Sequence, residues 1–468
     1  MRRDMKPTKK NWTWPAQGVP LAELRTRLAK AEAKNISYHR QSIIGFPGTI
    51  PLREAMDVHR MFALEHANNI GYHTGDQQAE FGFLGTQELE REFVYSAASL
   101  FGSQNPEAEV DGYICFGGTE GNDHGLWLGR NRLWQTQPVY GGKRGIVVLT
   151  SFLGHYSFIK HFGRLFDNEP RDTADTNVFQ EVSTNQNGEM EPQVLERIIR
   201  RHYSSGYRRF LVALNAGTTN LGSVDPVTDI CSMLQSLRIE FKTRDGIGVH
   251  VHVDAAFGGL VLPFLEPDCQ FGFENELVSS IIVDVHKMGY VPYSAGLFLC
   301  RKGFLRYTET PAQYLRGHSD STVSGSRSGA IAAACWTAMH VLGRDGYTAR
   351  IKECMQNLMY LREGLSQFNS DGVERVHFYP TRMNILTVSL SEDLRLALIE
   401  GENHGLRGKF CIPEDAFPTD LTNPEWEGNL IRRTAAVFRF VVMPHVTRDR
   451  IDTFIDELRA RYQSRVAV

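Results

Sequence analysis

A series of short apolar runs begins near residue 110 and alternates with helical stretches. Continuous apolar runs are typical of strands that are buried on both faces of a sheet. Helical stretches between such strands indicate crossover connections, which join parallel strands. The runs are Tyr113–Phe116, Ile146–Thr150, Val178–Val182, Phe210–Leu214, Val249–Val253, Ile281–Val285 and Leu297–Cys300. The sequence therefore predicts an α/β fold around a mainly parallel, seven-stranded sheet.

The chain has a different pattern on either side of this series. The first 60 residues are polar, and a charged helix is expected over Leu21–Asn35. After about residue 340 we expect a long helix, two strands and a final helix, at Tyr347–Phe368, Asn384–Leu390, Arg439–Met443 and Arg448–Tyr462. These patterns predict three parts: an N-terminal helical segment over residues 1–60, a large domain over 61–343 and a smaller α+β domain over 344–468.

Composition excludes several classes of protein. The net charge is −3, from 51 basic and 54 acidic residues, and no basic domain or stripe favours a nucleic-acid partner. The best apolar stretch, Gly329–Gly343, is too short for a membrane span and is interpreted as a buried helix. We find no secretory signal. The seven cysteines include no CxxC pair, which argues against a zinc site, and no metal is expected. Their odd number and wide spacing are typical of reduced thiols in the cytoplasm.

The candidate site lies where the predicted strands end. In open α/β sheets, ligands bind beyond the carboxyl ends of the strands. The segments there are Gly117–Asn122, Ser151–His155, Asn215–Thr219, Asp254–Ala256 and His286–Lys287. Together they supply a glycine-rich turn, a histidine, a threonine pair, an aspartate and a lysine.

The lysine and the aspartate suggest a specific chemistry. Lys287 follows a buried strand, so it is either a surface residue or a reactive amine that can form a Schiff base. Asp254 alone could be a helix N-cap. Beside a lysine it has a second interpretation, because a pyridoxal phosphate site needs a lysine for the internal aldimine and a carboxylate at the pyridine nitrogen. The carboxylate keeps that nitrogen protonated.

The glycine-rich turn and the histidine are weaker signals. Gly117–Asn122 precedes a helical run, and glycines at a helix N-terminus allow close approach to a phosphate. The turn matches neither the dinucleotide fingerprint nor the nucleoside-triphosphate phosphate loop, and it could be only a turn. His155 is either a structural histidine or a ring that stacks on a cofactor.

These segments together resemble the group II pyridoxal-phosphate-dependent amino-acid decarboxylases, from about residue 40 to the C-terminus. The resemblance rests on NNIG at 68–71, GGTEGN at 117–122, HYS at 155–157, NGE at 187–189, GTT at 217–219, HVDAAFGGLVLPF at 252–264, DVHK at 284–287 and GSRSG at 325–329. The set is similar to the bacterial histidine decarboxylase and plant serine decarboxylase branch. It also has features of the archaeal tyrosine/aspartate decarboxylases, and sphingosine-phosphate lyase is a more distant relative.

The resemblance implies an aspartate-aminotransferase-like fold, fold type I of pyridoxal phosphate enzymes, with the cofactor in the large domain. It implies that Lys287 carries the aldimine, Asp254 pairs with the pyridine nitrogen and His155 stacks on the ring. The remaining cofactor contacts that it implies are Gly118, Thr119, Glu120 and His286 at the phosphate, Thr218 and Thr219 at the cofactor's edge, and Ala256 against the other ring face.

The resemblance also implies a homodimer with shared active sites. The N-terminal segment would take part in dimerisation, and Ser326 in the SGSRSG segment would help to complete the neighbour's phosphate site. In the family, a tyrosine on a mobile loop after the lysine is proposed to protonate the substrate carbon. Tyr314 is the candidate here, with Tyr307 as a second choice and an ordinary loop tyrosine as the alternative.

The sequence departs from the family pattern at the expected substrate contacts. Tyr72 and His73 stand where the family often has Asp-Pro or Asp-Trp, so we expect them to contact the substrate. Arg439 could pair with a substrate carboxylate, or it could form a structural salt bridge. Histidine, serine, and aromatic or acidic amino acids are the candidate substrates.

We therefore expect a cytoplasmic enzyme that converts an L-amino acid into its amine and CO2. One alternative is another carbon–carbon lyase, similar to sphingosine-phosphate lyase. A decarboxylative oxidative deaminase is a second, which a phenylalanine in place of Tyr314 would favour. A non-catalytic homologue is disfavoured because both Lys287 and Asp254 are present.

Overall fold

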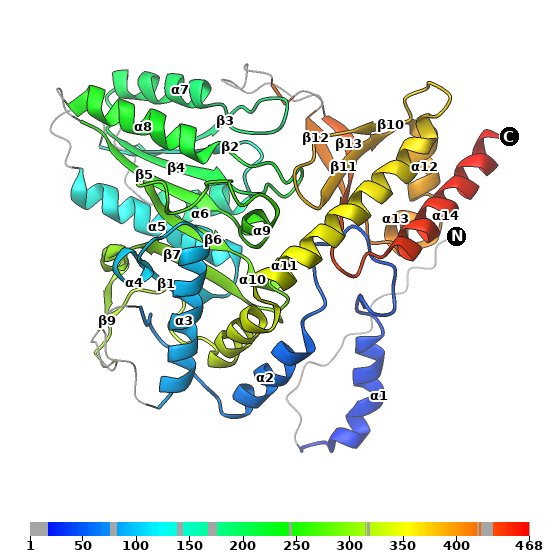
Figure 1. Cartoon of the computed structure of the whole chain (residues 1–468), viewed down its shortest axis with the longest axis horizontal. Coiled ribbons are helices and arrows are strands. Elements are labelled where there is room, and N and C mark those ends of the chain that lie inside the picture. The colour runs from blue at the N-terminus through cyan, green and yellow to red at the C-terminus, as the bar shows by residue number, and fades with distance from the viewer. Residues whose placement is uncertain are drawn as a thin grey trace. The chain divides into compact units, whose positions relative to one another are not determined.

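The computed structural model describes residues 17–74, 82–137, 144–166, 176–242, 246–313, 315, 319–418, 421–422 and 434–467. The chain divides into two compact units, Met1–Gln41 and Ser42–Val468. The first unit contains helix α1 (Leu21–Glu32), slightly shorter than the sequence predicts. All other elements belong to the second unit (Figure 1).

The second unit contains the predicted seven-stranded sheet. Its strands are β1 (Val110–Cys115), β2 (Ile146–Ser151), β3 (Val178–Val182), β4 (Arg209–Asn215), β5 (Gly248–Asp254), β6 (Val278–Val283) and β7 (Gly296–Arg301). They lie in the order β1-β7-β6-β5-β4-β2-β3. Strands β2 to β6 pair in parallel, whereas β7 is antiparallel to both β1 and β6. The prediction of a mainly parallel sheet is thus confirmed.

Helices cover both faces of this sheet because its central strands are apolar on both sides. Along β2, Val147 and Leu149 face a core shared with α3, α7 and α8, while Ile146 and Val148 face a core shared with α5 and α6. The helices of this part are α2 (Arg53–Leu64), α3 (Leu84–Leu100), α4 (Pro106–Glu109), α5 (Gly118–Thr136), α6 (Ser157–Phe166), α7 (Pro192–Ser204), α8 (Val227–Lys242), α9 (Leu262–Leu265) and α10 (Val285–Met288).

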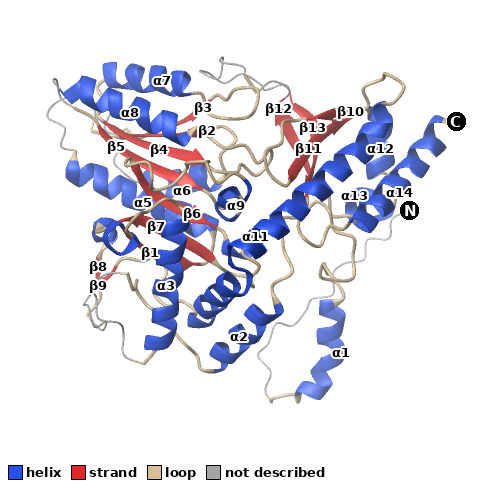
Figure 2. Cartoon of the chain, in the orientation of Figure 1, coloured by secondary structure: helices blue, strands red, loops and turns tan. Residues whose placement is uncertain are grey.

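A second sheet follows the long helix α11 (Gly329–Ser366), as Figure 2 shows. Its antiparallel strands lie in the order β10-β11-β13-β12. They are β10 (Val376–Phe378), β11 (Ile385–Leu390), β12 (Glu414–Pro418) and β13 (Thr434–Val441), with helices α12 (Glu392–Ile399), α13 (Gly405–Lys409) and α14 (Arg448–Val466). These elements share a hydrophobic core of their own with the C-terminal half of α11, as expected for an α+β part.

The predicted boundaries at 60/61 and 343/344 stay predictions. Residue Gly343 has non-helical backbone angles inside α11 (φ 57°, ψ −175°), and the predicted helix Tyr347–Phe368 corresponds to the segment after this point. A pair of two-residue antiparallel strands, β8 (Thr310–Pro311) and β9 (Ser319–Asp320), lies on either side of position 314 in the sequence. Among the described helices, each is too short or too polar to cross a membrane.

Close packing of α5 on β6 gives a prediction about stability. A Cβ atom at Gly121 would lie 2.1 Å from Cδ1 and 2.8 Å from Cβ of Ile282, whereas a Cβ at Gly85 in α3 would meet open space. We expect Gly121→Ala to lower the free energy of unfolding by about 1–3 kcal/mol. Gly85→Ala, the matched control, should raise it by up to about 1 kcal/mol. Denaturant unfolding followed by circular dichroism measures both, and equal changes would contradict this packing.

Candidate active site

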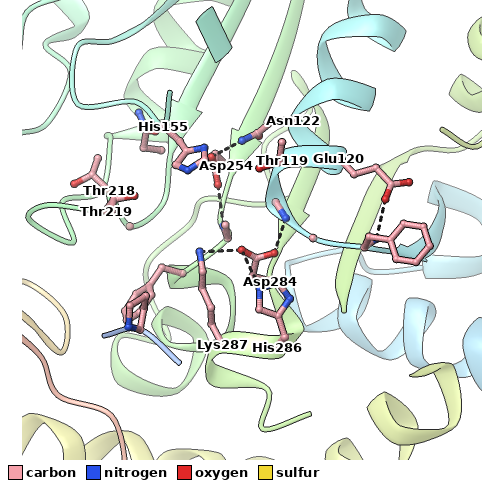
Figure 3. Close-up of a pocket in the computed structure, with 18 of the residues that line it drawn as sticks. Thr119, Glu120, Asn122, His155, Thr218, Thr219, Asp254, Asp284, His286 and Lys287 are labelled. Carbon is pink, nitrogen blue, oxygen red and sulfur yellow. Dashed lines mark hydrogen bonds and ion pairs between the residues drawn. The ribbon is translucent and has the colours of Figure 1, made fainter. Parts of the chain in front are cut away.

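A cavity of about 550 Å³ lies beyond the carboxyl ends of β2, β4, β5 and β6. All five predicted strand-end segments contribute to its wall (Figure 3). The predicted site residues that line it are Gly118, Thr119, Glu120, His155, Thr218, Thr219, Asp254, Ala256, His286, Lys287 and Arg439. The structure therefore brings most of the candidate residues together, although they are spread over more than 300 positions of the sequence.

Lys287 is paired with a buried carboxylate. It lies on α10, the short helix that follows β6, and its Nζ is 2.8 Å from Oδ2 of Asp284 (Figure 3). The other oxygen of Asp284 accepts a hydrogen bond of 2.5 Å from the backbone N–H of Gly118. Burial disfavours the charged amine, but the attraction and hydrogen bond of Asp284, together with the attraction of Asp254, outweigh burial and raise the pKa of Lys287 above its ordinary value. Lys287 is therefore held as a cation in this arrangement.

Asp254 ends β5 with both carboxylate oxygens engaged. Oδ1 accepts a hydrogen bond of 3.0 Å from the backbone N–H of Ala256, and Oδ2 accepts one of 2.7 Å from Nδ2 of Asn122. The first bond is the local turn contact expected of a capping residue. The carboxylate is also part of the cavity wall, so the capping role and a ligand-binding role are compatible.

His155 is held by hydrogen bonds with Ser157, two residues later in the sequence. Its Nδ1 lies 2.8 Å from Oγ of Ser157, and the backbone N–H of Ser157 lies 3.3 Å from the same nitrogen. Burial is the largest influence on this ring, and it lowers the pKa of His155 despite the opposing attraction of Asp254. The imidazole is therefore neutral at neutral pH.

The glycine-rich turn leads into the N-terminus of α5. Gly117 has φ 149°, a conformation that favours glycine, and a Cβ at Gly118 would lie 3.1 Å from Oδ2 of Asp284 and 3.2 Å from Cβ of Ala256. The side chain of Glu120 points toward the residue that precedes the turn, and its Oε2 accepts a hydrogen bond of 2.8 Å from the backbone N–H of Phe116. Burial raises the pKa of Glu120. The backbone N–H groups of the first turn, rather than the Glu120 carboxylate, suit an anion.

The threonine pair and Arg439 form the side of the cavity next to the second sheet. Oγ1 of Thr218 lies 2.6 Å from Oγ of Ser223, so this hydroxyl is already occupied within its loop. Nη1 of Arg439 donates to the Thr219 carbonyl at 3.2 Å and lies 3.5 Å from Oδ2 of Asp415. Burial lowers the pKa of Arg439. Both sequence interpretations of Arg439 therefore fit, since it lines the cavity and forms a structural ion pair.

Three predicted residues lie outside the lining of this cavity, and a fourth is not described. Nε2 of His73 lies 3.4 Å from Oε2 of Glu90, and burial lowers the pKa of His73 to about 4. Burial also raises the pKa of Tyr72 to about 12. Oγ of Ser326 accepts a hydrogen bond of 3.3 Å from Asn68. The roles proposed for these residues stay predictions, and Tyr314 lies outside the described residues.

Among the residues of the site that sequence reasoning missed are Asn122, Asp284 and Tyr293. Asn122 closes the glycine-rich turn, and Asp284 stands three residues before Lys287, a spacing that brings side chains together on a helix. Both signals were available in the sequence. Tyr293 lines the cavity with its ring centroid 4.3 Å from that of His286, and its loop position gave no signal.

These residues fit pyridoxal phosphate. An amine and a carboxylate line the same cavity, as the cofactor's aldehyde and ring nitrogen require. The N-terminus of α5 supplies N–H groups for a phosphate. Ala256 also lines the cavity, and its small side chain would leave room for a flat ring.

Comparisons with known proteins identify the family. The model of the pyridoxal-dependent decarboxylase conserved domain matches residues 136–376, slightly more than half of the chain. A tryptophan decarboxylase of Clostridium sporogenes is 29% identical, covering 93% of this chain and 95% of its own length. A probable L-tyrosine/L-aspartate decarboxylase of Methanothrix thermoacetophila is 30% identical, with 96% and 97% covered.

A solved structure supports the same fold. The crystal structure of L-methionine decarboxylase from Streptomyces sp. 590 superposes with a TM-score of 0.75 at 21% identity, covering 96% of both chains. The expected fold type I architecture is thus confirmed. The family and sequence matches establish pyridoxal phosphate as the cofactor and the decarboxylation of an amino acid as the reaction. The chain belongs to the pyridoxal-dependent decarboxylase family.

Proposed function

We propose that Lys287, Asp254 and His155 form the catalytic centre at which this decarboxylase converts an L-amino acid into its amine and CO2. The observation that carries the proposal is the meeting of Lys287 and Asp254 in one cavity with the N-terminus of α5. When bound, pyridoxal phosphate supplies an electron-withdrawing ring that takes up the electron pair left behind as the carboxylate departs as CO2.

Each residue has a task that follows from its surroundings. Lys287 must lose a proton before its Nζ can form a covalent bond, and Asp284, at 2.8 Å, orients this amine and stabilises its charged form until the cofactor binds. Asp254 would supply a negative charge that favours the protonated ring nitrogen of the cofactor. His155, a neutral imidazole in the cavity wall, would cover one face of the cofactor ring. Gly118, Thr119 and His286 would hold the phosphate.

The walls of the cavity suggest how the substrate is held. Pro47, Phe257, Ile385 and Val441 supply apolar surface, and Arg439 supplies a cation on the same side as Ile385 and Val441. We therefore favour an amino acid whose α-carboxylate or side-chain acid pairs with Arg439. The relatives, named for tryptophan and for tyrosine or aspartate, span both apolar and acidic side chains.

Incubation of the purified protein and added cofactor with each of the twenty amino acids tests this function. We expect stoichiometric CO2 and amine from one substrate or a small related group. Assays for aldehyde and peroxide on the same samples detect oxidative deamination. Absence of CO2 from every amino acid, with the cofactor bound, would contradict the proposal.

Arg439→Gln is expected to raise KM by about 10- to 100-fold while changing kcat much less, because a hydrogen bond to a charged group contributes about 1.5–3 kcal/mol. Arg439→Lys should recover part of the loss by keeping the charge. Arg382 is the matched control, since it pairs with Glu266 at 2.7 Å but does not line the cavity. An unchanged KM in Arg439→Gln, measured by steady-state kinetics, would leave Arg439 with a structural role only.

Tyr314 stays a proposal from its place in the sequence, after Lys287. If its hydroxyl protonates the carbon that has lost its carboxylate, Tyr314→Phe should still release CO2 but form amine about 100- to 10,000-fold more slowly. Oxygen should then divert part of the product to aldehyde, ammonia and peroxide. Tyr307→Phe tests the second candidate for the same role, and it should form amine at the wild-type rate if Tyr314 is the proton donor. Amine formation at the wild-type rate by Tyr314→Phe would remove Tyr314 from the mechanism.

We further propose a cytoplasmic homodimer in which the two subunits share their active sites, on the strength of the family resemblance. Mixing Tyr314→Phe protein with Lys287→Ala protein tests this arrangement. If Tyr314 serves the partner's lysine, one site of a mixed dimer carries both changes and the other carries neither. Recovered activity supports shared sites. No recovery despite proven subunit exchange contradicts them.

A further inference from the structure

A chain of buried polar side chains lies behind Asp254 and His155. Asn122, on α5, contacts Asp254 on one side and His252, on β5, on the other (Figure 3 shows the first contact). Ser280, on β6, contacts the far nitrogen of His252. The exposed fractions are 1% for Asn122 and 0% for His252 and Ser280, so each group depends on the next for hydrogen bonding.

The direction of each hydrogen bond follows from Asp254. A carboxylate only accepts, so Asn122 must present its NH2 group to Oδ2 at 2.7 Å. The amide oxygen then faces Nε2 of His252 at 2.9 Å, and this nitrogen must carry a hydrogen. Burial lowers the pKa of His252 to about 3, so the ring is neutral and carries only that one hydrogen. Its Nδ1 therefore accepts from the Ser280 hydroxyl at 2.9 Å.

A second branch runs from Asn122 to His155. The other N–H of the Asn122 amide donates to Oγ of Ser157 at 2.9 Å. The Ser157 hydroxyl is then free to donate to Nδ1 of His155 at 2.8 Å, and the backbone N–H of Ser157 approaches the same atom at 3.3 Å. Nδ1 of His155 is thus an acceptor for both, which leaves the imidazole hydrogen on Nε2.

We propose that Asn122 and His252 are positioning residues, which fix the orientation of the Asp254 carboxylate and the tautomer of His155 through this buried chain. The inference rests on the proposed function, since it concerns the two groups that would hold the cofactor ring. Because one amide serves both groups, a change at Asn122 disturbs Asp254 and His155 together. A change at His252 reaches the hydrogen bonds of both groups through Asn122.

A cofactor analogue separates this role from a merely structural one. Cofactor-free protein is titrated with pyridoxal phosphate and with deazapyridoxal phosphate, in which carbon replaces the ring nitrogen, and the two dissociation constants are compared. Wild-type protein should prefer the natural cofactor, because only its ring nitrogen can pair with Asp254. Asn122→Ala and His252→Leu should reduce this preference by about 10-fold, the size expected for a hydrogen bond to a charged group.

The protein offers a matched control at His124 and a conservative variant at His252. His124 also lies on α5 with an exposed fraction of 0%, but it contacts Tyr113 and Thr308 instead, so His124→Leu should keep the full preference. His252→Gln should retain most of the preference for pyridoxal phosphate, because a glutamine amide can donate a hydrogen bond to the amide oxygen of Asn122. If His252→Leu does not fold, Ser280→Ala tests the same series of hydrogen bonds. It should also reduce the preference for pyridoxal phosphate.

The outcomes distinguish this inference from the proposed function. If Asn122→Ala and His252→Leu weaken binding of both cofactors equally, or leave the preference unchanged, the positioning role is wrong. If wild-type protein itself shows no preference, the role proposed for Asp254 fails first. A reduced preference in these variants with a wild-type value for His124→Leu supports the inference.

Discussion

Lys287→Ala is expected to slow decarboxylation by on the order of 10,000-fold or more and to abolish the near-visible absorption of the bound cofactor. The side chain is proposed both to hold the cofactor covalently and to carry protons, and positioned proton transfer alone contributes about 100- to 10,000-fold. Steady-state assays of amine formation and an absorption spectrum of the purified protein measure the two effects independently.

A second lysine–aspartate pair provides the control for this variant. Nζ of Lys302 lies 3.0 Å from Oδ1 of Asp111, and neither residue lines the cavity. Lys302→Ala also removes an ion pair with a buried carboxylate, so it should cost stability but leave the absorption band intact. A Lys287→Ala protein that keeps both the band and the rate would refute the assignment.

Asp254→Asn is expected to retain the cofactor and to lose roughly 100- to 1,000-fold in kcat, the size measured when a preorganised electrostatic contact is removed. An amide can still accept the hydrogen bond from Ala256, so the local turn should survive. It cannot supply the negative charge that keeps the ring nitrogen protonated. The variant therefore separates the capping role of Asp254 from its electrostatic role.

Asp111→Asn is the matched control for Asp254→Asn, because Asp111 is also buried, with an exposed fraction of 2%. It should lower the thermal unfolding midpoint without a comparable loss of kcat. Near-wild-type turnover by Asp254→Asn, with normal cofactor content, would show that the carboxylate acts only as a cap.

Much of the fold could be predicted because strands that are buried on both faces appear in the sequence as continuous apolar runs. The run Phe210–Leu214 is apolar without interruption, and it lies inside the sheet as β4, between β5 and β2. The direction of a strand leaves no such pattern, so the antiparallel β7 was not foreseen. Nor were β10, which has three residues, and the polar edge strand β12.

The candidate site was predictable where a charged side chain follows a buried strand, because such a position is unusual for a charged residue. A lysine after a buried strand and an aspartate at a strand end are such cases, and Lys287 and Asp254 do line one cavity. Contacts that depend on side-chain direction were not predictable. The turn of Glu120 back to Phe116 and the engagement of Thr218 with Ser223 became visible only in the structure.

Borohydride reduction of the cofactor-loaded protein, followed by peptide mapping, tests whether Lys287 is the residue that holds the cofactor. Reduction fixes the cofactor permanently on whichever amine holds it, and mass spectrometry of the digest then locates the modified residue. We predict a single cofactor-bearing peptide, modified at Lys287. A cofactor adduct on a different lysine, or none when pyridoxal phosphate is supplied in excess, would contradict the assignment of Lys287 as the residue that holds the cofactor.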